Sequence, residues 1–110
     1  MRIWDIPPEK LCRNHLLGEH RELHAIWNIL TLGKKGYCRH PETLRWKGKL
    51  KALFLRHRKL VNEMKARGYC HYSDLPAGLA KGKKNQDKFV DSVEEQLRIL
   101  KNKRCNCVIS

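Results

Sequence analysis

The chain has 110 residues, of which 41% are hydrophobic and 32% charged, so it can bury one modest core and we expect a single domain over residues 1–110. Its 24 Lys and Arg exceed its 11 Asp and Glu, a net charge of +13. A small domain this basic is typical of proteins that bind a polyanion, most often nucleic acid, because each neutralised phosphate releases counterions. No apolar run approaches the roughly 18 residues of a membrane span, and charges and prolines interrupt any signal peptide at the start. We therefore expect a cytoplasmic protein that binds no membrane.

Five cysteines, an odd number without a secretory signal, predict a reducing compartment and neutral thiols. None of them forms the C-x-x-C spacing of a strong zinc site, so we expect no metal. Four pairs come closest: Cys12 and His15, Cys38 and His40, Cys70 and His71, and Cys105 and Cys107. The remaining histidines are interpreted as packing or surface residues, namely His20, His24, His57 and His71.

The first ten residues should form an extended arm, because Pro7 and Pro8 break early regular structure. Asn14 is then placed to cap a helix that runs to about Leu32 and stops at the glycines that follow. Its apolar stripe has helical spacing. The stripe consists of Leu16, Leu23, Ile26, Trp27 and Leu30.

Three polar residues of this helix, His15, Glu19 and Glu22, follow one another at spacings of four and three, so they share one side. That side borders the apolar stripe, and we expect the two carboxylates to face a groove against the rest of the fold. Gly18 and Ala25 keep the adjoining surface low, which leaves room for a partner to approach closely.

A second helix is predicted over 42–67, because Pro41 suits a first turn and Gly68 a helix end. A third is predicted over 86–103. Its inward side should carry Phe89, Val90, Val93, Leu97 and Leu100. No segment alternates with period two. The expected fold is therefore all-α, a compact single domain of three main helices with an extended N-terminal arm.

Three stretches carry a family resemblance. They are "HLLGEHREL" at 15–23, preceded by Arg-Ile at 2–3, the pattern "KL..L..R...L..E...RGY" within 49–69, and "SDLP" at 73–76. In this order and spacing, the first 76 residues resemble the pyrimidine-dimer DNA glycosylases, a family of UV-repair enzymes.

The resemblance implies an all-α enzyme that acts on damaged double-stranded DNA, as a monomer and without cofactor or metal. The N-terminal amine attacks the C1′ of the sugar that carries the 5′ base of a cyclobutane pyrimidine dimer, an imine forms, and β-elimination cuts the strand. Carried over by position, the nucleophilic residue is Met1 and the catalytic carboxylate is Glu22. The lesion-site residues are Arg2, Arg21 and His15, with Asn14, Arg45 and Lys47 as further DNA contacts.

This chemistry suits the residues themselves. An α-amine has a reference pKa of about 7.7–8.0, so an appreciable fraction is neutral at pH 7, and Arg2 and Arg21 should lower it further. Glu22 can offset positive charge that develops on the sugar and can move protons. The arginines can grip the phosphates beside the lesion. On helix pattern alone, Glu22 would be an ordinary helix ion pair.

Three features depart from the family. Met1 places a long side chain at the reacting nitrogen, Ala25 replaces a family arginine whose contact Arg45 or Lys47 would have to supply, and an aromatic C-terminal tail is absent. The stacking that the tail provides could come from other aromatics. These are Trp4, Tyr37, Trp46, Tyr69 and Tyr72.

Other interpretations stay open. The ending Cys107-Val108-Ile109-Ser110 fits a prenylation motif, which would anchor the protein to a membrane in a eukaryotic cell. The chain could instead be a non-catalytic DNA-binding protein, or a glycosylase or lyase for another damaged base. The basic segment 80–88 is either a phosphate-contacting loop or a solvated charged turn.

Overall fold

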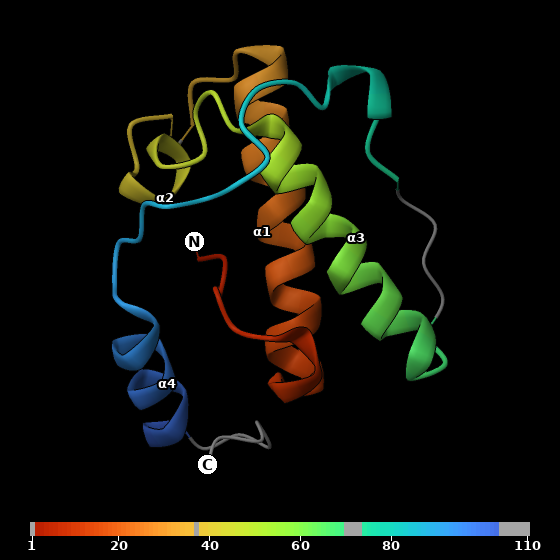
Figure 1. The fold of residues 1–110 in the computed structure, drawn as a ribbon, viewed down its shortest axis with the longest axis vertical. Helices are drawn as coiled ribbons and strands as arrows, with labels where there is room; N and C mark the ends of the chain where they lie inside the picture. Colours follow the sequence, from red (N-terminus) through yellow and green to blue (C-terminus); the bar gives the residue numbers. More distant parts are fainter. Residues whose placement is uncertain (1, 37, 70–73, 104–110) are drawn as a thin grey trace.

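A computed structural model describes residues 2–36, 38–69 and 74–103 and is built from helices (Figure 1). In chain order they are η1 (Pro8–Lys10), α1 (Arg13–Leu32), α2 (Pro41–Leu44), α3 (Leu50–Ala66), η2 (Ala77–Leu79) and α4 (Val93–Asn102). The described residues contain no strand, only an isolated bridge between Lys49 and Gly82. The prediction of an all-α fold is confirmed. None of the described helices combines the length and the apolar character needed to cross a membrane.

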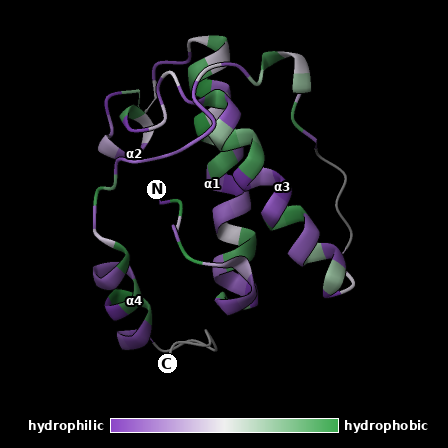
Figure 2. Cartoon of the chain, viewed as in Figure 1, coloured by the Kyte–Doolittle hydropathy of each residue, from purple (hydrophilic) through white to green (hydrophobic). Residues whose placement is uncertain are grey.

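The core lies where α1 and α3 pack side by side (Figure 1). The apolar stripe predicted for the first helix contributes to this core. In Figure 2 both helices carry hydrophobic bands between hydrophilic ones. Five apolar side chains of this core are wholly inaccessible to solvent: Leu16, Leu23, Ile26, Leu53 and Leu60.

The first predicted helix is confirmed, with one correction at its start. Cys12 is the N-cap residue, and Asn14 lies exposed inside the first turn instead of capping the helix. The helix ends as predicted at Gly33, whose φ of 66° is the left-handed conformation that glycine adopts without steric cost.

The single helix predicted over 42–67 is wrong, because the chain leaves helical geometry between α2 and α3. Gly48 has φ 76° there and turns the chain. Because α3 begins after this turn, its first backbone N–H groups have no acceptor within the helix and need hydrogen-bond partners from another segment. The segment after η2 supplies them: Lys51 and Ala52 donate backbone N–H groups to the carbonyls of Lys81 and Lys83, at 3.0 and 3.1 Å.

The third predicted helix is shorter than expected, since α4 begins at Val93. Ser92 caps it by accepting a hydrogen bond from the Glu95 N–H, and a capped start of this kind favours initiation there. Phe89 and Val90, predicted to face inward, lie before the helix with 46% and 50% of their surface exposed. The segment from η2 to this point crosses the surface as a largely hydrophilic strap (Figure 2).

The N-terminal arm is extended, as predicted, but it is part of the core. It runs between α1 and α4 (Figure 1), and Ile3, Trp4 and Ile6 are each more than nine-tenths buried. Some predictions fall outside the described residues and stay predictions. They concern Met1, Tyr37, Cys70, His71, Tyr72 and the ending at 104–110.

We predict that Gly82→Ala destabilises the fold. Gly82 has φ 93°, and a Cβ there would overlap the carbonyl oxygen of Gly48 in the turn that leads into α3. We expect a loss of about 2 kcal/mol or more in the free energy of unfolding, measured by urea denaturation. Gly78→Ala is the matched control, because nothing lies within 4 Å of a Cβ at that position. Equal stability of the two variants would contradict the packing of this strap.

Candidate active site and nucleic-acid interface

A buried ion pair joins α1 to α3 and holds the arm. Glu19 accepts two hydrogen bonds from Arg56, Nε to Oε2 at 2.7 Å and Nη2 to Oε1 at 3.0 Å. The backbone N–H of Trp4 donates to the same Oε1 at 2.9 Å. Burial raises the pKa of the Glu19 carboxyl, while Arg56 and the Trp4 N–H oppose that rise. The prediction that Glu19 faces a groove is wrong. Glu19 is buried, with 2% of its surface exposed, and it links α1 to α3 and the arm.

A second buried cluster secures the residue before Trp4. The Ile3 N–H donates to Glu42 Oε1 at 3.2 Å, and Arg45 Nη2 donates to the Ile3 carbonyl at 3.0 Å. The Arg45 guanidinium also pairs with Glu42 at 2.7 Å and with Asp5 at 3.0 Å. Both backbone polar groups of Ile3 are therefore bound to charged side chains in the interior.

Helix α4 and Asp91, two residues before it, complete the support of the arm. The Asp5 N–H donates to Gln96 Oε1 at 2.8 Å, and Gln96 Nε2 donates back to Asp5 Oδ2 at 3.0 Å. Arg2 pairs with Asp91 at 2.8 Å and lies over the Trp4 ring, 4.9 Å from its centroid. The first described residues are thus fixed by side chains far away in sequence.

His15, the predicted active-site histidine, lies beside the arm. Its ring meets Trp4 edge-on with centroids 5.7 Å apart, and its Nδ1 lies 3.1 Å from Cys12 Sγ. Burial, followed by the nearby Lys103, lowers the pKa of His15, which favours the neutral ring. A neutral imidazole can accept or donate a proton close to the start of the chain.

Among the described residues, the Glu22 carboxylate has no fixed partner. It is half-buried on α1, and within the described parts of the chain its side chain forms no hydrogen bond or ion pair. Most other described carboxylates are paired with a basic side chain, and the two further unpaired ones, Glu9 and Glu94, are exposed. The pairs are Asp5 and Glu42 with Arg45, Glu19 with Arg56, Glu63 with Arg67, Asp87 with Lys49, Asp91 with Arg2, and Glu95 with Arg98.

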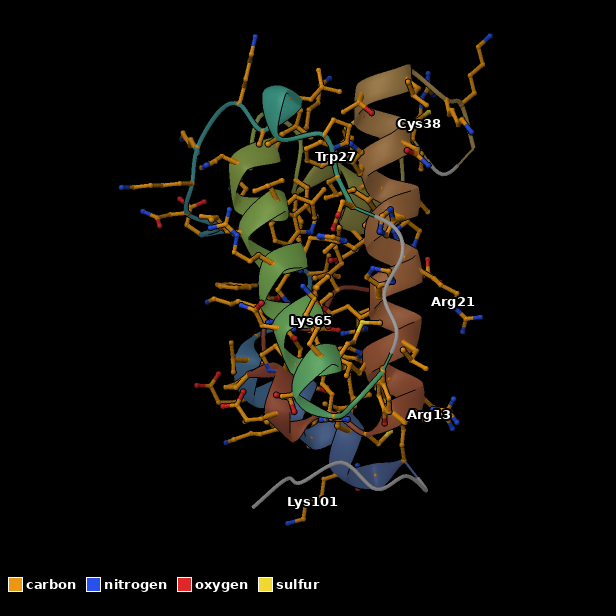
Figure 3. The ribbon with its side chains drawn as sticks, turned by 90° about the vertical axis from the view of Figure 1, so that its right-hand side faces the viewer. Arg13, Arg21, Trp27, Cys38, Lys65 and Lys101 are labelled. Atoms are coloured by element: carbon orange, nitrogen blue, oxygen red, sulfur yellow. The ribbon has the colours of Figure 1, made fainter. Side chains whose placement is uncertain are left out.

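The side of α1 turned away from α3 offers an open surface, which we call the open face. By helical spacing it carries Asn14, Gly18, Arg21, Glu22 and Ala25. Nothing lies within 4 Å of a Cβ built on Gly18. Arg21 points into solvent away from α3 (Figure 3), and a hollow of about 410 Å³ beside it is lined by Asn14, Leu17, His20 and Arg21. The arginine and the carboxylate therefore lie on one open side of α1.

The two proposed substitutes for the family arginine differ in position. Arg45 is buried with 6% of its surface exposed, and its guanidinium is occupied by the arm. This placement does not support a phosphate contact from Arg45. Lys47, two residues on, is exposed.

Two of the aromatics considered for stacking, Trp4 and Trp46, belong to the core, with 6% and 2% of their surface exposed. Tyr69 is half-buried. A groove of about 960 Å³ lies away from the open face, between residues 5–9 of the arm, α3 and the segment 84–89. Its lining includes several basic side chains and the stacking candidate Trp46, but none of the residues predicted for catalysis or DNA contact. We place the candidate site at the open face, because the uncommitted carboxylate is there.

Sequence reasoning missed the pairing of Glu19 with Arg56 and a contact among His20, His24 and His57. Signals for both were present. Arg56 lies in the quoted motif at 49–69. His57 is spaced with the buried apolar residues of its helix, and a polar ring buried there requires a polar partner.

The sequence model described as "Pyrimidine dimer DNA glycosylase" matches residues 1–76, and the chain belongs to this family of DNA-repair glycosylases. The matched part contains the arm, α1, α2, α3 and every predicted site residue. No curated protein and no solved structure matches the chain.

We predict that alanine variants separate the roles of Arg45 and Lys47. Arg45→Ala leaves buried Glu42 and a buried carbonyl uncompensated, so the free energy of unfolding should fall by about 3 kcal/mol or more. Lys47→Ala should leave stability within about 0.5 kcal/mol and weaken binding to duplex DNA. Chemical denaturation and fluorescence anisotropy measure the two effects. A stable Arg45→Ala variant with weakened DNA binding would reverse the assignment.

Proposed function

We propose that the protein is a DNA glycosylase with abasic-site lyase activity that excises UV-induced cyclobutane pyrimidine dimers through an imine at its N-terminal α-amine. The observation that carries the proposal is the family match over residues 1–76, combined with an uncommitted Glu22 on the helix that anchors the arm. Glu22 lies three residues after Glu19, about one helical turn, and Glu19 binds the Trp4 N–H. The start of the chain and the carboxylate are thus held on one helix.

The reacting group is the neutral α-amine of Met1, whose own position lies outside the described residues. Its reference pKa, about 7.7–8.0, leaves a usable neutral fraction at pH 7, whereas a lysine at about 10.4 is almost fully charged. The amine adds to C1′ as the glycosidic bond breaks, and the base leaves with the bonding electrons. The C1′–O4′ bond then breaks, which opens the sugar ring, places a proton on O4′ and gives the imine. The imine acidifies the C2′–H bond, and loss of that proton expels the 3′ phosphate. Hydrolysis of the imine then frees the amine.

Glu22 stabilises the positive charge that develops on the sugar and takes the C2′ proton. A carboxylate with no ion-pair partner among the described residues is suited to this role, because no cation has to be displaced first. His15 beside the arm, in its neutral form, assists proton movement near the amine.

Phosphate binding falls to Arg21, Arg2 and Lys47, with Asn14 as a polar contact on the open face. Arg21 is exposed and forms no ion pair within the described residues. Arg2 is held by Asp91, with about a third of each side chain exposed, so a DNA phosphate can exchange with that carboxylate. The dimer must leave the base stack to reach C1′, as in other enzymes that act inside a duplex.

Blocking the amine tests the mechanism. We predict that a tertiary amine made by reductive methylation, or a residual N-terminal tag, abolishes strand cutting and the borohydride-trapped complex on dimer-containing and abasic duplexes. DNA binding should persist, because the basic surface is unchanged. Peptide mapping of the trapped complex should place the DNA on Met1. An adduct on a lysine such as Lys34 or Lys47 would refute the amine as nucleophile, and binding without any adduct would favour the non-catalytic alternative.

We predict that Glu22→Gln keeps the binding of damaged duplex and lowers turnover by a factor on the order of 100 or more. Glutamine preserves size and helix propensity, so the change removes charge alone. Glu94→Gln is the control, since Glu94 is an exposed carboxylate on α4 with no ion pair among the described residues. Single-turnover cleavage of a dimer-containing duplex measures the effect, and wild-type turnover in Glu22→Gln would rule out the catalytic role.

A further inference from the structure

Three histidines converge between α1 and α3, outside the residues assigned to the glycosylase site. His20 and His24 are one turn apart on α1, and His57 faces them from α3. The Nε2 atom of His24 lies 3.2 Å from Nε2 of His20 and 3.1 Å from Nε2 of His57. All three ligand nitrogens lie within 4.8 Å of one another.

Hydrogen bonds alone do not account for this arrangement. A ring nitrogen of neutral imidazole has one in-plane position, which holds either a proton or a lone pair, so it makes one well-aligned hydrogen bond. His24 Nε2 faces two other Nε2 atoms at hydrogen-bond distance. At most one of these two contacts can therefore be a well-aligned hydrogen bond. If both share His24 Nε2, then His20 and His57 direct like groups, two lone pairs or two N–H groups, toward the same point. Protonating the rings increases the repulsion.

A metal ion resolves the conflict, because it binds all three lone pairs at once. Nitrogens about 2.05 Å from a tetrahedral Zn²⁺ are about 3.3 Å apart, close to the observed 3.1 and 3.2 Å. The same geometry sets ring centroids about 5 Å apart, and the three observed separations are 4.6, 4.9 and 5.1 Å. The two nitrogen distances from His24 and the three ring separations fit three imidazoles around one ion, and all three nitrogens lie within 4.8 Å of one another.

The ligand chemistry selects the class of ion. Three imidazole nitrogens suit Zn²⁺ and neighbouring transition metals, whereas Mg²⁺ and Ca²⁺ require oxygen ligands. His57 is buried, with 4% of its surface exposed, while His20 and His24 are half-buried. His20 also lines the hollow beside Arg21, which leaves a direction from which a water can complete the coordination.

We propose that His20, His24 and His57 form a zinc site that clamps α1 to α3. The site does not depend on the glycosylase chemistry. It joins the helix that carries Glu22 and Arg21 to the helix that carries Arg56, so the bound ion stabilises the framework of the open face. Ligand binding to the folded state alone raises stability in proportion to the logarithm of ligand concentration.

The experiment uses the full chain, stripped of metal with a chelator and titrated with Zn²⁺ in a calorimeter. We expect one Zn²⁺ per chain and a rise in Tm, with no change from Mg²⁺. Co²⁺ should produce the visible absorption bands of a tetrahedral nitrogen site. His57→Gln and His20→Gln should each weaken Zn²⁺ binding by roughly 100-fold or more and remove the rise in Tm. His20→Gln alters a half-buried position, so it reports on binding even where His57→Gln lowers folding.

His40→Asn is the matched control, a half-buried histidine at the N-cap of α2 where asparagine also caps. It should bind Zn²⁺ as the unmodified chain does. Zn²⁺ binding that survives in His20→Gln, or that is lost in His40→Asn, would overturn the site. An unmodified chain that binds no Zn²⁺ and shows no change in Tm would overturn it equally.

Discussion

The buried backbone of the N-terminal arm is the constraint on which the rest of the structure depends. Because residues 3–5 are not paired in a helix or sheet, their buried N–H groups need other acceptors, or each costs a lost hydrogen bond. Side chains of Glu42, Glu19 and Gln96 supply them in turn. Two of these acceptors are charged, and a buried charge requires a partner. This requirement explains why Arg45 and Arg56 lie inside a protein that has many exposed cations.

Buried ion pairs of this kind contribute little net stability, since desolvation offsets most of their attraction. What they provide is direction. The Glu19 carboxylate binds Arg56 of α3 and the Trp4 N–H at the same time, and these two contacts fix the position of the arm. For a reaction at the start of a chain, such positioning matters more than stability, because a misplaced nucleophile loses much of its effective concentration.

The support of the arm extends beyond the part of the chain that the family model matches. Asp91 and Gln96 lie after residue 76, yet they hold Arg2 and Asp5. The strap that precedes them also caps the start of α3. The segment after the match thus completes the framework of the candidate site. α1 then serves two surfaces, with the histidine cluster toward α3 and the open face on the side away from it.

The sequence by itself determined the helical class, the apolar stripes of α1 and α3, the extended arm and the family. The helical class and the stripes follow from hydrophobic periodicity, the arm from Pro7 and Pro8, and the family from the order of its motifs. Each of these signals is contained in short stretches of sequence. The sequence also singled out Glu22 and Arg21, since their motif is local. The break at Gly48 was missed because glycine in a helical pattern is ambiguous until its φ is known.

Only the tertiary structure decided which polar residues are committed to the interior. Glu19 and Glu22 have the same chemistry and nearly the same side of one helix, yet Arg56 of α3 binds one of them and leaves the other available. Likewise, both Arg45 and Lys47 were predicted as phosphate contacts, but Arg45 is buried and binds the arm, whereas Lys47 is exposed. Helical periodicity specifies the side on which a residue lies. Its partner comes from another element, at a distance and angle that the packing of the helices sets.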